Sequence, residues 1–232
     1  TPGTAKKTID AVFNLCSRND AVIIFASTGV AFDENVNAGG ILMDIAGVTL
    51  YGVDLPEICN SNAGGTAVIT VSVNDSKIIG VYINETSFRG ISCTSDYNVF
   101  ANNVIHGDFG HGVYLNNADS NEVGYNVLKN MGQNTIAGVA MDGTCAENIV
   151  HHNVIKNADY GVRVIHANCT TNTVQGNVIE GAAGGTARGI SIEAGSHTFV
   201  ADNIMGACVV SIVDAGTSTV LVNNREVSKY TR

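Results

Sequence analysis

The chain has 232 residues, of which 45% are apolar and 14% are charged, and its formal net charge at pH 7 is −9. This length and apolar content allow one substantial hydrophobic core, while the acidic balance argues against binding to DNA, RNA or anionic membrane surfaces. Because no apolar run approaches the roughly 18 to 20 residues that a membrane-spanning helix needs, we also expect no membrane span.

A short amphipathic helix is predicted near the N-terminus. Its apolar residues recur at helical spacing and are Ile9, Val12, Phe13, Leu15 and Cys16. Thr8 or Thr4 is the candidate N-cap residue. Since the terminal repeats of a stacked protein must cover their apolar end, we expect residues 1–20 to form a cap.

Residues 21–97 contain short strand candidates at irregular spacing. They are Val22–Phe25, Val48–Tyr51, Ile78–Ile79 and Val81–Ile83. Their β-branched and aromatic residues favour strands, so we expect this segment to form the first, irregular coils of a solenoid.

From Asn98 to Asn224 the chain repeats a phrase that reads Asn-x-x-x-x-Asn-Val-Ile, then polar residues, then Gly-Val-x-Val. The second Asn of successive copies is Asn103, Asn126, Asn153, Asn177, Asn203 and Asn224, which gives steps of 23, 27, 24, 26 and 21 residues. A period of this length that tolerates insertions at a fixed phase is typical of a solenoid.

Each copy divides into three short strand candidates, which leaves no room for a helix. Stacked strands of this kind predict an all-β parallel β-helix of roughly nine coils, each about 4.8 Å above the last. Residues of equal phase are then vertical neighbours, so the recurring Asn residues should form an inward ladder of hydrogen-bonded amides.

We expect residues 1–232 to form a single domain, with irregular coils at 21–97, regular coils at 98–224 and a tail at 225–232. After Asn224 too few residues remain for a convincing cap. Because an open coil exposes apolar side chains and unpaired strand groups, we expect self-association, a further domain or a folded-back tail to cover this end.

One outer face of the predicted solenoid combines reactive and charged side chains. Strand alternation from the third-strand Gly of each repeat points these residues outward. They are Arg89, His111, Tyr114, Asn116, Asp142, Tyr160, Arg163, Arg188 and Glu193. Enzymes that act on acidic polysaccharides need cations for the carboxylates, a base that removes a proton and a Tyr or His that returns one.

We therefore predict an acidic polysaccharide site on this face. The predicted catalytic residues are Tyr114, His111 and Asp142, and the predicted substrate-binding residues are Arg163, Arg89, Asn116, Tyr160, Arg188 and Glu193. The alternative interpretation is a solvated sheet face whose charges are incidental.

The N-terminal segments resemble the start of the pectate-lyase-like superfamily of right-handed parallel β-helices. The matching residues are Thr8–Val12, Asn19–Ile24, Gly29, Asp33–Val36 and Val48–Gly52. The later coils are similar to the repeats of mannuronan C5-epimerases and of periplasmic carbohydrate-binding β-helix proteins. This resemblance implies a right-handed β-helix that is secreted, on the cell surface or periplasmic, and that binds and possibly modifies an acidic polysaccharide by lyase or epimerase chemistry. A non-catalytic adhesin, a phage or virus spike segment or a self-assembling surface protein is the alternative.

Catalytic motifs of two related families match only in part. Gly110-His111-Gly112 and Val162–Ile165 resemble polygalacturonases, but the paired carboxylates that glycoside hydrolysis requires are missing, so we do not expect a hydrolase. The strand at 89–94 corresponds to the Tyr-Gly-Phe-Asp-Pro-His segment of mannuronan epimerases and lacks its Tyr, Asp and His.

The sequence predicts no metal site and no other cofactor. His151-His152 has no Cys or carboxylate at ligand spacing in the sequence, and none of the six Cys forms a C-x-x-C motif. Cys145 and Cys169 each lie three residues before the first Asn of a repeat and should stack one coil apart. Two thiols or a disulfide would fit there, and an oxidising compartment would suit the disulfide.

Overall fold

The computed structural model describes residues 8–26, 31–34, 40–61, 66–85, 89–107, 110–130, 136–181 and 187–227. Parts of the sequence-based predictions lie outside these residues. They are the Thr4 cap, Gly29, Asn35 and Val36 of the N-terminal resemblance, and the end of the tail at 228–232.

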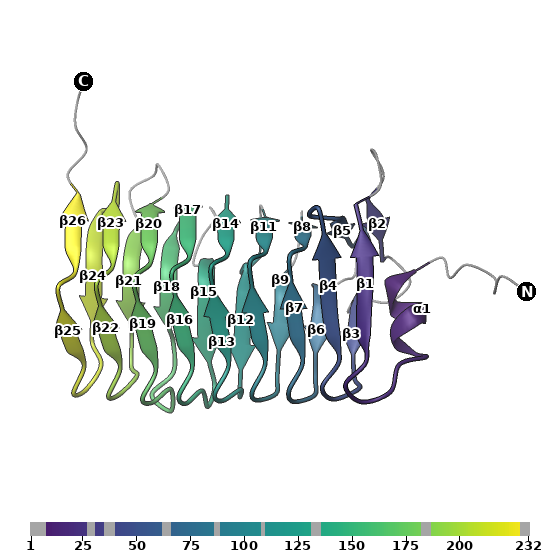
Figure 1. Cartoon of the computed structure of the whole chain (residues 1–232). Coiled ribbons are helices and arrows are strands. Elements are labelled where there is room, and N and C mark those ends of the chain that lie inside the picture. Colours follow the sequence, from purple (N-terminus) through teal and green to yellow (C-terminus); the bar gives the residue numbers. More distant parts are fainter. Residues whose placement is uncertain are drawn as a thin grey trace, which may run out of the picture.

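The described strands stack into an elongated parallel solenoid with the two ends of the chain at its opposite ends (Figure 1). Each coil contributes strands to three sheets in turn, and in the described residues sheets A and B have nine strands each while sheet C has eight. The all-β parallel β-helix predicted from the Asn repeat is therefore confirmed.

The strands of sheet A follow one another in chain order along the solenoid. They are β1 (Ala21–Phe25), β4 (Thr49–Val53), β7 (Lys77–Ile79), β10 (Val99–Ala101), β13 (Glu122–Gly124), β16 (Ile149–His151), β19 (Thr173–Gln175), β22 (Phe199–Ala201) and β25 (Val220–Val222).

Sheet B begins after the turn that follows each strand of sheet A. Its strands are β2 (Phe32–Asp33), β5 (Glu57–Cys59), β8 (Tyr82–Glu85), β11 (Val104–Gly107), β14 (Val127–Lys129), β17 (Val154–Ala158), β20 (Val178–Gly181), β23 (Ile204–Gly206) and β26 (Arg225–Val227).

Sheet C completes each coil and carries the predicted polysaccharide site. Its strands are β3 (Ile41–Met43), β6 (Ala67–Val71), β9 (Arg89–Cys93), β12 (Val113–Asn116), β15 (Ala137–Asp142), β18 (Tyr160–Val164), β21 (Arg188–Ile192) and β24 (Val210–Asp214).

A short helix covers the first coil, as predicted, but it is smaller than the apolar spacing implied. Helix α1 spans only Ile9–Phe13, and its N-cap is Thr8, whose Oγ1 accepts a hydrogen bond from the Ala11 N–H. Leu15 was predicted on the apolar face, yet the helix ends before it and leaves it 67% exposed. The buried Glu34 carboxylate accepts the N–H groups of Ile9 at 2.6 Å and of Asp10 at 3.2 Å. These bonds tie the helix to the first coil.

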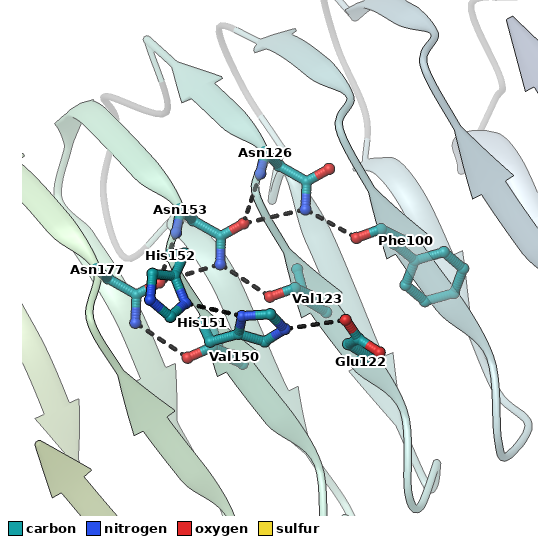
Figure 2. Close-up of polar contacts among 9 residues, drawn as sticks. All are labelled: Phe100, Glu122, Val123, Asn126, Val150, His151, His152, Asn153 and Asn177. Carbon is teal, nitrogen blue, oxygen red and sulfur yellow. Dashed lines mark hydrogen bonds and ion pairs between the residues drawn. The ribbon is translucent and has the colours of Figure 1, made fainter.

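The predicted ladder of Asn side chains is present and runs along the turn between sheets A and B. Each Nδ2 donates to the Oδ1 of the Asn in the next coil, at 2.9 to 3.1 Å, from Asn103 to Asn224. Each Oδ1 also accepts the backbone N–H of the preceding ladder Asn (Figure 2). Because these amides are buried, they replace water as partner of the turn backbone.

The first Asn of each repeat forms a second ladder at the turn between sheets C and A. Asn121 Nδ2 donates to Asn148 Oδ1, and Asn148 Nδ2 donates to Asn172 Oδ1, each at 3.1 Å. Both turns of the coil are thus fixed by stacked amides, which explains why the spacing between the two Asn residues of a repeat stays constant.

The last coil exposes apolar side chains. These are Val209, Val210, Val220, Leu221, Val222 and Val227, with exposed fractions between 37% and 59%. The expectation that another chain, a further domain or the tail covers this end stays a prediction.

Candidate functional site

The predicted polysaccharide face lies on the outer surface of sheet C, in vertical columns. The pairing register places Tyr114, Ala140 and Arg163 in one column. A second column contains Tyr160 above Ala137 and Arg188 above Tyr160, and Asn116 pairs with Asp142 in a third. The intervening residues, such as Leu115 and Met141, are fully buried in the core. The structure therefore brings the predicted residues together as strand alternation required.

The N-terminal half of this face is a cluster around Tyr114. The Arg89 guanidinium lies 3.7 Å from the centre of the Tyr114 ring, and the His111 ring stacks on Tyr114 with a centroid distance of 5.3 Å. The Tyr114 hydroxyl donates to Asp142 Oδ2 at 2.8 Å. Four predicted residues from three coils are thus in direct contact.

The C-terminal half is a cluster around Tyr160. Arg163 makes a bidentate ion pair with Glu193, with Nε–Oε1 and Nη2–Oε2 distances of 2.9 and 3.0 Å. The guanidinium groups of Arg163 and Arg188 lie 4.6 and 5.3 Å from the Tyr160 ring centre. Arg188 reaches Glu193 only at 4.0 Å, and its side chain is 37% exposed against 16% for Arg163. Arg188 is therefore better placed than Arg163 to accept an incoming anion.

Two small residues separate the clusters. Ala137 and Ala140 belong to the outer face, yet both are fully buried because they pack with Tyr114, Tyr160 and Ile165. The two tyrosines thus stand on a common apolar floor.

Protonation states follow from burial and contacts. Burial, together with the charges of Arg89 and Arg163, lowers the pKa of His111 to about 4, so the imidazole is neutral at pH 7. Its Nδ1 accepts the Ala137 N–H at 3.0 Å, which leaves the proton on Nε2. Burial and the bond to Asp142 raise the pKa of Tyr114 to about 12.

Asp142 remains ionised. Burial alone would raise its pKa, but the hydrogen bonds from Tyr114 and from the Gly143 N–H outweigh this effect and lower it. At neutral pH, His111 and Tyr114 are therefore hydrogen-bond donors, and Asp142 is the charged acceptor of the trio.

The low pKa of His111 predicts a loss of stability in mild acid. The unfolded chain takes up the His111 proton near pH 6.5, whereas the folded protein takes it up near pH 4, so protonation between these values favours unfolding. Between pH 7.5 and pH 5 the wild type should lose about 1–2 kcal/mol more than His111→Gln. Urea unfolding of both proteins at a series of pH values measures this difference, and parallel curves would contradict the pKa assignment.

A second polar cluster, not predicted from the sequence, lies at the turn between sheets A and B. His151 Nδ1 is 3.0 Å from His152 Nδ1, and His151 Nε2 is 2.9 Å from Glu122 Oε1 (Figure 2). Tyr125 stacks on His152, with a centroid distance of 5.2 Å. The signal for this cluster was present as phase, because Glu122 and Ile149 are paired and His151 therefore lies two positions beyond the residue above Glu122.

Metal and membrane features were searched across the described segments only. In those segments, no three or more His, Cys, Asp or Glu side chains are arranged to hold a metal ion. The described part of the chain also has no helix of the length and apolarity needed to cross a bilayer.

Cys145 and Cys169 lie in adjacent coils, as predicted, and both are buried free thiols. The hydrogen bond between the two thiols lowers the pKa of Cys145 and raises that of Cys169. The disulfide alternative is therefore not formed in this structure.

Two hollows lie away from the sheet C face. One, of about 280 Å³, opens on sheet B and is lined by Leu55, Tyr82, Val104, His106 and Lys129. The other, of about 590 Å³, lies on the last coils and is lined by Asp202, Ile204, Asn223, Asn224 and Arg225.

Comparison with solved structures gives weak likenesses to β-helix enzymes. The alginate lyase from Paenibacillus sp. str. FPU-7 is 11% identical, over 94% of this chain and 95% of that chain, with a TM-score of 0.44. A double mutant of the periplasmic alginate epimerase AlgG is 17% identical, over 90% of this chain and 68% of that chain, with a TM-score of 0.39. A single mutant of AlgG gives 16%, 89%, 68% and 0.33 for the same quantities. No curated protein matches the chain.

A family match is more extensive. The family described as periplasmic copper-binding protein (NosD) matches residues 56–225, which is more than half of the chain and includes the whole predicted face and the His151–His152 cluster. Its periplasmic description agrees with the location outside the cytoplasm that the sequence predicted. The chain belongs to the NosD family of periplasmic β-helix proteins.

Proposed function

We propose that the outer face of sheet C binds an acidic polysaccharide. The observation that supports this most directly is local charge. Arg89, Arg163 and Arg188 face only two carboxylates, those of Asp142 and Glu193, in a chain whose net charge is −9. With His111 neutral, this face is a positive site on an acidic protein, and such a site attracts an anionic ligand.

The arrangement of the face suits a linear polymer. The Tyr114 and Tyr160 clusters lie on β12 and β18, two coils apart, which corresponds to about 10 Å along the solenoid axis. Guanidinium groups bind carboxylates through paired hydrogen bonds. We assign the first contact with a uronate carboxylate to Arg188, because it is the more exposed of the two arginines beside Tyr160.

Modification of the bound glycan is the finer part of this proposal. A lyase or epimerase reaction requires one group that removes a proton next to the carboxylate and another that returns it. His111 presents an N–H and Tyr114 keeps its proton, whereas Asp142 is ionised and touches Tyr114. We therefore assign the role of base to Asp142 and that of proton donor to Tyr114.

The test is a panel of alginate, pectate and glycosaminoglycans, scored for binding and for unsaturated products. For the glycan that binds, Arg188→Ala should weaken affinity about tenfold or more, because a charge-assisted hydrogen bond contributes about 1.5–3 kcal/mol. Arg225→Ala removes the same charge from an exposed position on sheet B and should bind as wild type. Wild-type binding by both Arg188→Ala and Arg163→Ala would place the glycan elsewhere.

The catalytic assignment has its own outcome. If products form, Asp142→Asn should abolish them while retaining binding. Binding without products from any glycan identifies a binding protein and not an enzyme. A protein that binds none of the panel but self-associates supports the structural alternative, for which the exposed apolar residues of the last coil are the specific observation.

A further inference from the structure

We propose that His151 and His152 form a two-imidazole binding site for Cu(II), with Glu122 as a positioning residue. The site lies at the turn between sheets A and B and shares no residue with the sheet C face. Its failure or success is therefore independent of glycan binding.

Hydrogen bonding prepares His151 as a ligand. Its Nε2 lies 2.9 Å from Glu122 Oε1, and because a carboxylate only accepts, the ring proton belongs on Nε2. The lone pair of Nδ1 then points away from Glu122 and toward His152. Histidines that bind metals commonly donate their second N–H to a carboxylate in this way, which fixes the tautomer and orients the ring.

The spacing of the two rings suits a shared metal. In the structure the two Nδ1 atoms are 3.0 Å apart, so one proton lies between them. Two nitrogens each about 2.0 Å from one metal are separated by about 2.8 Å at right angles and about 3.3 Å in a tetrahedron. A metal can therefore replace the shared proton with little ring movement, and the proton of His152 moves to its exposed Nε2.

The fold keeps the space around both rings open. A Cβ on Gly124, in the coil before His151, would lie 2.5 Å from His151 Nε2. A Cβ on Gly176, in the coil after His152, would lie 3.2 Å from His152 Nε2, and Gly176 has a φ of +65°. Both neighbouring coils thus carry Gly beside the rings, while Tyr125 supports His152 from the other side.

Copper is the metal that these ligands favour. The described residues offer no third His, Cys, Asp or Glu at this point, so water must complete the coordination sphere. With only two imidazoles, affinity follows the general order of divalent metals, in which Cu(II) ranks highest. The description of the NosD family as copper-binding agrees with this choice.

The experiment is a titration of the whole chain with Cu(II), followed by calorimetry and electron paramagnetic resonance. We expect one strong site whose spectrum shows two coordinated nitrogens, and weaker binding of Zn(II). His152→Gln should lower the affinity at least tenfold, since it removes one of two protein ligands at an exposed position. The matched control is His197→Gln, at another exposed turn position with positive φ (54° against 51° for His152), and it should bind as wild type.

Glu122→Gln tests the positioning role. It should weaken Cu(II) binding about tenfold while the two-nitrogen spectrum and the melting temperature stay unchanged. Equal affinity of wild type and His152→Gln, or a spectrum with fewer than two nitrogens, would overturn the proposal and identify the copper as adventitiously bound.

Discussion

Replacing Asn153 by Ala should lower the free energy of unfolding by about 3 kcal/mol. The Asn153 Oδ1 accepts both the backbone N–H and the Nδ2 of Asn126, at 2.9 and 3.0 Å. Its own Nδ2 donates to the Val123 carbonyl at 2.8 Å and to Asn177 Oδ1 at 3.0 Å (Figure 2). Since the residue is fully buried, water cannot replace these partners in the variant.

Denaturant unfolding followed by circular dichroism measures this change. Asn157→Ala is the matched control, because Asn157 makes one exposed amide contact, to Asn130 Oδ1 at 3.1 Å, and should change stability by less than about 0.5 kcal/mol. Equal stabilities of the two variants would be incompatible with a buried ladder.

Gly161→Ala should be about as damaging as the loss of a ladder amide. A Cβ on Gly161 would lie 2.4 Å from Ile179 Cγ2 and 2.5 Å from the Gly189 carbonyl oxygen. Neither atom can move away freely, since one belongs to the buried core and the other to the next strand of sheet C. Overpacking of this kind costs about 1–3 kcal/mol and occasionally more.

Gly206→Ala provides the control for this prediction. The nearest atom to a Cβ there is the Val227 carbonyl oxygen at 3.8 Å, an ordinary contact. Melting temperatures of the two variants should therefore separate clearly, with Gly206→Ala close to wild type. A Gly161→Ala protein that melts with the wild type would show that sheet C tolerates a wider spacing at this point.

Sequence reasoning predicted the coil well because the fold is dictated by phase. Asn126, Asn153 and Asn177 stack because each repeat places its amide at the same point of the coil, and insertions fall elsewhere. The same logic placed Tyr114 and Arg163 on one face, since alternation along a strand leaves only two sides.

What phase alone does not give is how neighbouring side chains interact. Tyr114 was predicted on an outer face, but stacking by Arg89 and His111 leaves it only 8% exposed. The His151–His152 pair was missed for a conformational reason. Consecutive residues of a strand point to opposite sides, but His152 has a φ of 51° and leaves the strand, which brings its ring beside His151.

The amide ladder also slows its own chemical ageing. An Asn side chain deamidates when the backbone nitrogen of the next residue attacks Cγ and ammonia leaves as a cyclic imide forms. After Asn126 and Asn153, that nitrogen belongs to Val127 and Val178's counterpart Val154, whose N–H groups are held by carbonyls of the preceding coil at 2.8 Å. The departing Nδ2 is held as well, by two acceptors in each case. The side chains that hold the coils together are therefore also the ones best protected against slow covalent damage outside the cytoplasm.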